Sequence, residues 1–501
     1  MKKYTYTLLM TALAMVLTPS CSKDFLETRP VGRTLELNHY QSQEQAFEAL
    51  VAIYDVLQWN DMYGFNMFRL LMNTASDEAH AGGSDASDQP SWVAFDNFTM
   101  NPNLGPQAGF WKKSYRGIYR ANYFLEVIET TPNTSAAFVE RTTAEAKFLR
   151  AKFYFDLLRL FGNAPLILEP LSPDQYYNVQ MVDQDALFAQ VEQDLTEAIV
   201  HLPVSISGNQ KGRASKGAAQ ALLARAYLFM DDNDKMDEVA ALCEAVINSG
   251  EYALEQNYGD IFTLAGEHGV ESVFEISYTE LSNQGWWQFQ SGGGEGNVGT
   301  QFIGMRDYDG PTYATGWGFC PVSTDLVTTM GTDPRRVHTI IDVATDLPTA
   351  SYSAGYQNTG YFMRKYAPIA ANLAPDGDPA LNWGTNVREI RYADVLLMAA
   401  EGLVRSGGSD ATALGYVNQV RNRAGVQPLA SSGATLLADI YTERQLELAL
   451  EGHRYFDLIR TGQAATVLAS KGFNPAIHNW LPIPQNEIDA SQGALTQNPG
   501  Y

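Results

Sequence analysis

The chain has 501 residues, 45% of them hydrophobic, so it is long enough to bury a sizeable core. Its 34 basic and 57 acidic residues give a formal net charge of −23. Such a charge repels polyanions and argues against a nucleic-acid-binding protein, and three cysteines are too few for a disulfide framework.

The N-terminus is read as a targeting signal. A basic start precedes an apolar stretch over residues 8–17, which is too short to span a membrane and is typical of a secretory signal. We expect the signal to cover residues 1–20. Cys21 then stands where a bacterial lipoprotein is cut and lipidated, which would leave residues 21–39 as a polar tether. The alternative is an ordinary cleaved signal followed by an incidental cysteine.

Helical periodicity dominates from about residue 40 to residue 250. Residues 145–162 carry charged side chains at spacings near 3.6, and apolar residues fill the other positions. This pattern predicts a nearly buried helix that ends at Gly162, because Pro165 prevents its continuation. Cys243 lies in a later apolar helical run and is expected to be a buried thiol.

Two stretches, residues 221–250 and 396–425, can be overlaid without gaps. Each is predicted to be a helix, a short polar turn and a second helix that ends at a glycine, Gly250 or Gly425. With its lead-in, each unit is close to the ~34-residue period of tetratricopeptide-type helical pairs. The alternative is two unrelated antiparallel helix pairs in an ordinary bundle.

Helical periodicity disappears over residues 251–389, where Gly, Asn, Asp, Pro and aromatic residues dominate. Long irregular stretches inside a compact protein are uncommon and usually functional. Helical pattern returns over about 390–462, with residues 440–462 predicted as one strong helix. The expected fold is therefore mostly α, a single body over residues 40–501 of tetratricopeptide-like helical-pair repeats with an irregular, loop-rich insert.

Motifs for catalysis or metal binding are scarce. The sequence has no H-E-x-x-H, no G-x-S-x-G and no P-loop, and its seven histidines are scattered. Residues 294–299 match G-x-G-x-x-G but lack the strand before and the helix after that a dinucleotide site needs. Asp85 and Asp88 could ligate a structural calcium ion, although a solvated loop is favoured. We expect no cofactor.

Seven segments resemble, in the right order, the SusD/RagB family of Bacteroidetes outer-membrane lipoproteins. The C-terminal part carries ERQLELALEGHRYFDLIRTG, WLPIPQNEID and the terminal LTQNPGY. The other matching segments are residues 144–167, 212–230, 321–336 and 391–426. The resemblance covers essentially the whole chain, including the signal.

The resemblance implies a helical body of four tetratricopeptide-like pairs with an irregular part laid against it. It implies a lipid-anchored protein on the outward face of the outer membrane. It implies a SusC-like TonB-dependent transporter as partner, over which the protein acts as a lid. The family captures glycans, or in some members peptides, for nutrient uptake, and it is not known for catalysis.

The stretch NQGWWQFQSGGGEGNVGTQF, residues 283–302, places large aromatic rings in loop-like sequence. Aromatic faces stack on the C–H faces of sugar rings, and neighbouring polar side chains can bond sugar hydroxyls. Other segments of similar character add further candidates. The expected ligand-binding residues are Trp287, Trp317, Trp286, Trp92, Asp77, Asn283 and Tyr313. The alternative for each ring is that it only packs the insert onto the helices.

Three alternatives to glycan capture stay open at this point. The chain could capture peptides for the same uptake pathway. It could be a surface glycosidase, because two catalytic carboxylates can lie far apart in sequence. It could also be a structural helical-repeat scaffold for a protein partner, which would leave the aromatic insert unexplained.

Overall fold

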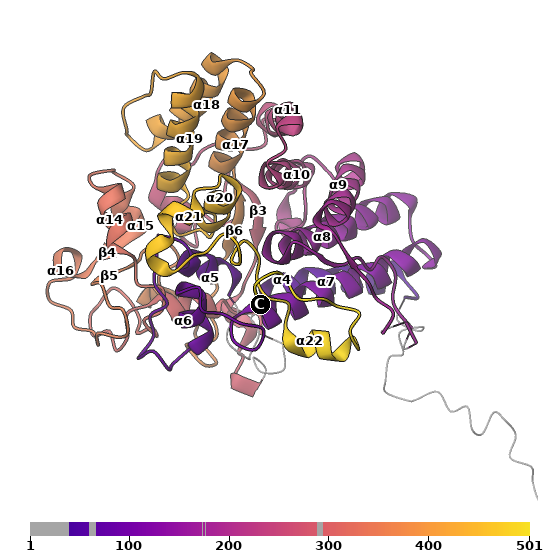
Figure 1. The fold of residues 1–501 in the computed structure, drawn as a ribbon, viewed down its shortest axis with the longest axis horizontal. Coiled ribbons are helices and arrows are strands. Elements are labelled where there is room, and N and C mark those ends of the chain that lie inside the picture. Colours follow the sequence, from indigo (N-terminus) through magenta and orange to yellow (C-terminus); the bar gives the residue numbers. More distant parts are fainter. Residues whose placement is uncertain (1–39, 60–66, 173, 176, 288–293) are drawn as a thin grey trace, which may run out of the picture.

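The structure, a computed structural model, describes residues 40–59, 67–172, 174–175, 177–287 and 294–501. The predicted signal, tether and lipidated Cys21 lie outside the described residues. Helices dominate the described part (Figure 1), and none of them is both long enough and apolar enough to cross a membrane.

The first helical region follows the sequence pattern closely. Its long helices are α4 (Gln43–Gln58), α7 (Gln107–Val127), α8 (Ala136–Phe161), α9 (Gln184–His201), α10 (Lys216–Met230) and α11 (Met236–Asn248). From α7 to α11, each helix packs against the next in the chain. The side chains of Ser135, Asp183 and Ser215 cap α8, α9 and α10 by accepting backbone N–H bonds. Gly162, at φ +68°, ends α8 as predicted.

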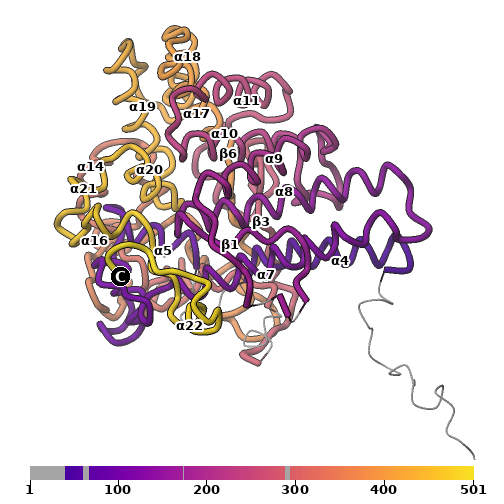
Figure 2. The backbone as a smooth tube through the Cα atoms, turned by 45° about the vertical axis from the view of Figure 1, so that its right-hand side comes forward, coloured from indigo at the N-terminus to yellow at the C-terminus, as the bar shows by residue number. Residues whose placement is uncertain are grey.

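The second helical region continues the same array after the insert. It contains α17 (Tyr392–Arg405), α18 (Asp410–Arg423), α19 (Gly433–Glu447) and α20 (Arg454–Arg460). Helix α17 packs directly against α11, so the two regions form one stack of helices (Figure 2). The overlay of α10–α11 on α17–α18 is confirmed as two helix–turn–helix units, and both final glycines have positive φ, +72° at Gly250 and +74° at Gly425.

The prediction of one helix over residues 440–462 is wrong, because a turn separates α19 from α20. Leu450 and Gly452 both have left-handed backbone, at φ +65° and +83°. The turn is held by buried donors: Asn73 Nδ2 donates to the Leu450 carbonyl at 3.0 Å, and Lys365 Nζ donates to the preceding carbonyl at 2.8 Å. These tertiary hydrogen bonds override local helix propensity.

Within the insert, β3 (Ser272–Ile276) pairs antiparallel with β6 (Val387–Arg391) at the insert's C-terminal end. This pairing brings together the two ends of the segment between β3 and β6. Other small elements are β4 (Ile340–Asp342), β5 (Tyr361–Met363), α13 (Val298–Ile303), α14 (Thr324–Met330), α15 (Arg336–Thr339) and α16 (Val343–Asp346). Outside the insert lie α5 (Phe68–Ala75), α6 (Pro90–Asp96), α21 (Ala464–Val467), α22 (Gln485–Ala490), β1 (Ala164–Pro165) and β2 (Met181–Val182). The insert lies at the lower left of Figure 1, against α5 and α6.

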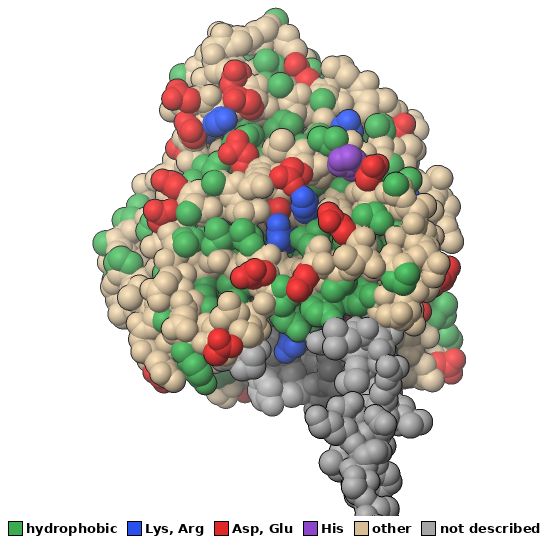
Figure 3. Space-filling view, turned by 90° about the vertical axis from the view of Figure 1, so that its right-hand side faces the viewer, with side chains coloured by type: hydrophobic (Ala, Val, Ile, Leu, Met, Phe, Trp, Pro, Cys, Tyr) green, Lys and Arg blue, Asp and Glu red, His purple; other side chains and the backbone are tan. Residues whose placement is uncertain are grey.

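A buried network of charges joins the insert to the last helices. Its members are Glu271, Arg335, Lys365, Arg391, Arg423, Glu443, Glu447 and Glu451. Burial alone would raise the pKa of Glu447, but the surrounding guanidinium groups lower it to about 2. The surface is different in character: Figure 3 shows acidic side chains spread over the face on the right of Figure 1, with fewer basic ones among them.

Candidate functional site

Three tryptophans form an aromatic surface on the insert, which we call the tryptophan platform: Trp286, Trp287 and Trp317. The rings of Trp286 and Trp317 stack with centroids 6.0 Å apart and planes 20° apart. Trp287 is 79% exposed and Trp286 is 41% exposed, whereas Trp317 is half-buried. Both adjacent tryptophans are therefore exposed: Trp286 lies over Trp317, and Trp287 projects into solvent.

The platform rests on a layer of buried rings. Trp317 meets Phe302 edge-on at 4.9 Å, and Phe302 stacks on Trp92 at 5.3 Å. Phe319 completes this layer, 4.7 Å from Phe302. Trp92 is fully buried, so the prediction that it contacts ligand is corrected: its ring supports the platform from below.

The Trp317 segment is held by Gln301. The backbone N–H of Trp317 donates to the Gln301 carbonyl at 3.0 Å, and Gln301 Nε2 donates to the Thr315 carbonyl at 3.0 Å. Trp383 Nε1 donates to Gln301 Oε1 at 3.3 Å. Both side chains are buried, so these bonds fix the backbone that presents the Trp317 ring.

The Trp286 segment is held by Asn382, the neighbour of Trp383. Asn382 Nδ2 donates to the Gln284 carbonyl at 2.8 Å, and the Gln284 N–H donates back to Asn382 Oδ1 at 2.9 Å. Gln284 Nε2 also donates to the Leu381 carbonyl at 2.7 Å. Residues 381–383 therefore anchor both segments of the platform and set the relative position of their rings.

Three other predicted ligand-binding residues have different places. Asn283 is exposed next to the platform, with left-handed backbone at φ +49°. Tyr313 is buried, and its hydroxyl accepts a hydrogen bond from Arg364 Nη1 at 3.1 Å, so the prediction of ligand contact is corrected. The partly buried Asp77 carboxylate accepts bonds from Arg454 at 2.9 and 3.0 Å and ties its loop to α20, a geometry that does not test its contact with ligand.

Two charged residues beside the platform were not singled out as ligand contacts from sequence. Arg306 Nη1 donates to the Trp317 carbonyl at 3.4 Å and lies 3.8 Å from the Asp88 carboxylate. Both side chains are partly exposed, at 34% and 26%. The signal in the sequence was an arginine that opens the aromatic segment RDYDGPTYATGWGF. The site therefore combines stacking faces with a donor and an acceptor for hydroxyl groups.

The loop considered for calcium is occupied by its own hydrogen bonds. Asp85 Oδ1 accepts from the Ser87 N–H at 2.8 Å, and Asp88 Oδ2 accepts from the Ser84 N–H at 2.8 Å. Hydrogen bonds from Ser87 lower the pKa of the exposed Asp85 carboxyl. Within the described ranges, no group of three or more His, Cys, Asp or Glu side chains is placed to hold a metal ion.

The fold and the sequence resemble those of known proteins. A family model described as "SusD family" matches residues 270–501, and one described as "Starch-binding associating with outer membrane" matches residues 24–228. A "SusD-like protein P25" of Formosa agariphila is 28% identical over 96% of this chain and 97% of its own length.

Two similar solved structures are named for glycan binding. One, titled "Laminarin binding SusD-like protein", has 39% identity and a TM-score of 0.86, over 92% of this chain and all of that one. Another is surface glycan-binding protein A from Bacteroides thetaiotaomicron in complex with laminarihexaose, at 31% identity and a TM-score of 0.83. It covers 91% of this chain and 99% of that one.

Proposed function

Because the chain belongs to the SusD family, we propose that it binds a β-1,3-linked glucan of the laminarin type on its tryptophan platform. The observation that carries this proposal is the exposure of Trp287, at 79%, beside the stacked Trp286 and Trp317. Large exposed apolar surfaces on soluble proteins mark interaction sites. The choice of glucan follows the solved structures at 39% and 31% identity, whose titles name laminarin and laminarihexaose.

The proposed binding mode follows from the chemistry of the platform. Glucose rings place their C–H faces against the indole rings, and the hydroxyls at the ring edges bond neighbouring polar groups. Arg306 donates and Asp88 accepts, while the Asn283 amide can do both. The role is capture without catalysis, so the glycan leaves the site chemically unchanged.

We further propose that the protein works at the cell surface as part of an uptake system. Lipidation at Cys21 would anchor it to the outer membrane, with residues 21–39 as the tether. One matching family model carries "associating with outer membrane" in its description, which supports this location. A SusC-like TonB-dependent transporter is the proposed partner, to which the captured glucan is delivered.

Calorimetric titration of the soluble body, residues 22–501, tests the binding proposal. The panel includes laminarin and laminarihexaose, with starch, mannan, xylan and peptides for comparison. We expect saturable binding of the β-1,3-glucans that Trp317→Ala and Trp287→Ala each weaken by about 5- to 150-fold, if a sugar stacked on a ring contributes about the 1–3 kcal/mol of a stacked base. Tyr177→Ala is the matched control, since Tyr177 is also an exposed aromatic, at 53%, outside the platform.

Two outcomes would contradict the proposal. Binding of the glucan that is indifferent to both tryptophan variants would place the site elsewhere. Binding of a peptide, with no binding of any glycan in the panel, would show that the ligand is a peptide.

A further inference from the structure

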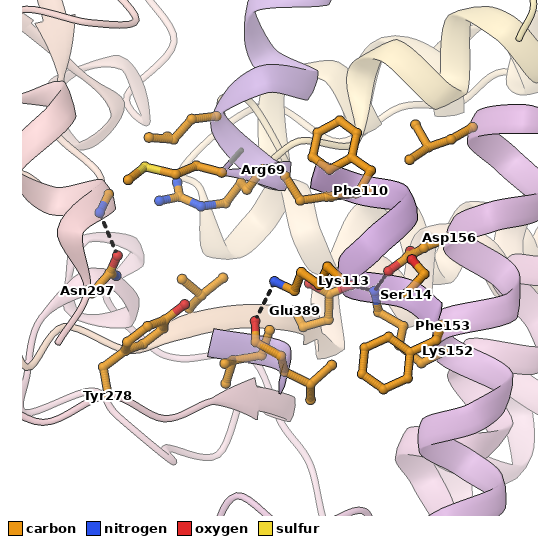
Figure 4. Close-up of a pocket in the computed structure, with 18 residues that line it drawn as sticks. Arg69, Phe110, Lys113, Ser114, Lys152, Phe153, Asp156, Tyr278, Asn297 and Glu389 are labelled. Carbon is orange, nitrogen blue, oxygen red and sulfur yellow. Dashed lines mark hydrogen bonds and ion pairs between the residues drawn. The ribbon is translucent and has the colours of Figure 1, made fainter. Parts of the chain in front are cut away.

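A cavity of about 80 Å³ lies between the helical region and the insert. Helices α5, α7 and α8 line it from one side, and β6 with residues after β3 line it from the other (Figure 4). Asn297 and Gly299, at the start of α13, also reach its wall. The tryptophan platform rests on the other end of α13, at Phe302, so the two sites are distinct.

The two carboxylates of the cavity are already paired. Lys152 Nζ lies 2.7 Å from Asp156 and 3.4 Å from Glu389. Arg159 adds a contact to Asp156 at 2.6 Å, and Arg225 lies 3.7 Å from Glu389. These three cations therefore neutralise the acidic groups of the wall.

Two further cations have no acidic partner. Within the described part of the chain, neither Arg69 nor Lys113 forms an ion pair with a carboxylate. Lys113 Nζ donates to two carbonyls at the end of α4, at 2.8 and 2.9 Å, and Arg69 Nη1 donates to the Leu450 carbonyl at 3.4 Å. Burial, with the nearby Lys152 ammonium, lowers the pKa of Lys113 to about 8, while the charges of Asp156, Glu389 and Asp55 act in the opposite direction. The cavity thus carries surplus positive charge in a protein whose net charge is −23.

The remaining wall supplies donors and apolar surface. Ser114 is 4% exposed, and its hydroxyl forms no hydrogen bond to any described residue. The Tyr278 hydroxyl likewise forms no hydrogen bond to any described residue. Figure 4 shows Tyr278 across the cavity from Arg69 and Phe110. The rings of Phe68, Phe110 and Phe153 line the rest. Two cations without a carboxylate partner, together with two hydroxyls that form no hydrogen bond to a described residue, fit an anionic occupant.

We propose that this cavity binds a short-chain carboxylate, with its carboxylate group facing Arg69, Lys113 and the Ser114 hydroxyl. The alkyl chain packs against the phenylalanine rings. An inorganic anion would satisfy the cations but leave the apolar wall without contacts. With a volume of about 80 Å³, the cavity has room for a ligand the size of propionate.

Calorimetry with sodium propionate, at constant ionic strength set by sodium chloride, tests this site in the purified protein. We expect saturable one-to-one binding that Lys113→Met weakens by about tenfold or more, because a charge-assisted contact is lost. Lys112→Met is the matched control, since Lys112 is exposed on the same helix, and it should leave binding unchanged. Ser114→Ala is a second variant that keeps all charges and should weaken binding too.

Three results would overturn the proposal. No saturable heat from a folded protein would remove the site, and equal competition by chloride would reduce it to an inorganic-anion site. Propionate binding that survives both Lys113→Met and Ser114→Ala would place the ligand elsewhere. Crystals soaked in 3-bromopropionate, whose bromine marks the end of the alkyl chain, give an independent readout, in which the anomalous bromine peak must lie among the phenylalanine rings. Laminarin binding is measured separately, so failure at one site does not imply failure at the other.

Discussion

Replacing Asn382 with alanine should disable the platform without touching a ring that contacts the glycan. The Asn382 amide exchanges two hydrogen bonds with the Gln284 backbone, at 2.8 and 2.9 Å, two residues before Trp286. A typical intramolecular hydrogen bond contributes about 1 kcal/mol net, so the pair stabilises this segment by about 2 kcal/mol. That free energy corresponds to about a 30-fold shift in the equilibrium between an ordered and a loosened segment. We expect affinity for laminarihexaose to fall by up to this factor.

The assay combines calorimetry with circular dichroism in the indole region. Two indoles stacked 6.0 Å apart at 20° couple excitonically, so the Trp286–Trp317 couplet reports their mutual geometry. Asn382→Ala should lose the couplet and the affinity together, while the melting temperature changes little. Asn372→Ala is the matched control, because Asn372 makes no side-chain hydrogen bond to a described residue. A variant with no couplet and full affinity would refute the argument that ring registration determines binding.

Three further predictions concern residues away from the platform. Asp77→Asn should lower the free energy of unfolding by about 1.5–3 kcal/mol, because its charge-assisted bonds to Arg454 are weakened, and leave laminarin affinity unchanged, as urea denaturation and calorimetry will show. Glu78 is buried, and desolvation with the nearby Asp77 charge raises its pKa from 4.5 to about 8. The folded state keeps a proton that the unfolded chain releases, so stability relative to Glu78→Gln should fall by about 1.4 kcal/mol per pH unit between these pKa values and level off above them, measured by urea unfolding from pH 5 to 9. Arg391→Met should destabilise by about 3–5 kcal/mol in the same assay, because it leaves three buried carboxylates undercompensated; a loss under 1 kcal/mol would contradict this.

The helical array was predictable because its signals are local. Charged side chains at helical spacing defined α8, and Gly162 with the following proline defined its end. The overlay of residues 221–250 on 396–425 likewise depended on glycines at matching turns. The break between α19 and α20 was not predictable, since Leu, Ala and Glu favour helix, and the turn is imposed by Asn73 and Lys365 from distant parts of the chain.

The site was predictable in composition and only partly in position. Tryptophans in a segment rich in Gly, Asn and Gln indicated binding, and the structure brings Trp286 and Trp317 together. The residue composition of an irregular segment does not show which way a ring faces. Trp92 and Tyr313, which are buried, therefore could not be told apart by sequence from the exposed aromatic residues. Asn382 gave no sequence signal, because its role depends on the Gln284 backbone, about a hundred positions away.

The buried charge network changes what kind of repeat protein this is. Arrays of helical pairs usually open unit by unit, because each unit contacts only its neighbours. Here Arg391 bonds Glu271, 120 positions earlier, and Glu447, 56 positions later, so distant units share one set of counterions. A chain that ended before α19 would leave the buried guanidinium groups of Arg335 and Arg391 without their carboxylate partners on that helix. The helical pairs are therefore not exchangeable modules: hydrogen exchange should find α17, β6 and α19 opening together, and shortened arrays should be obtainable only by redesigning the network with them.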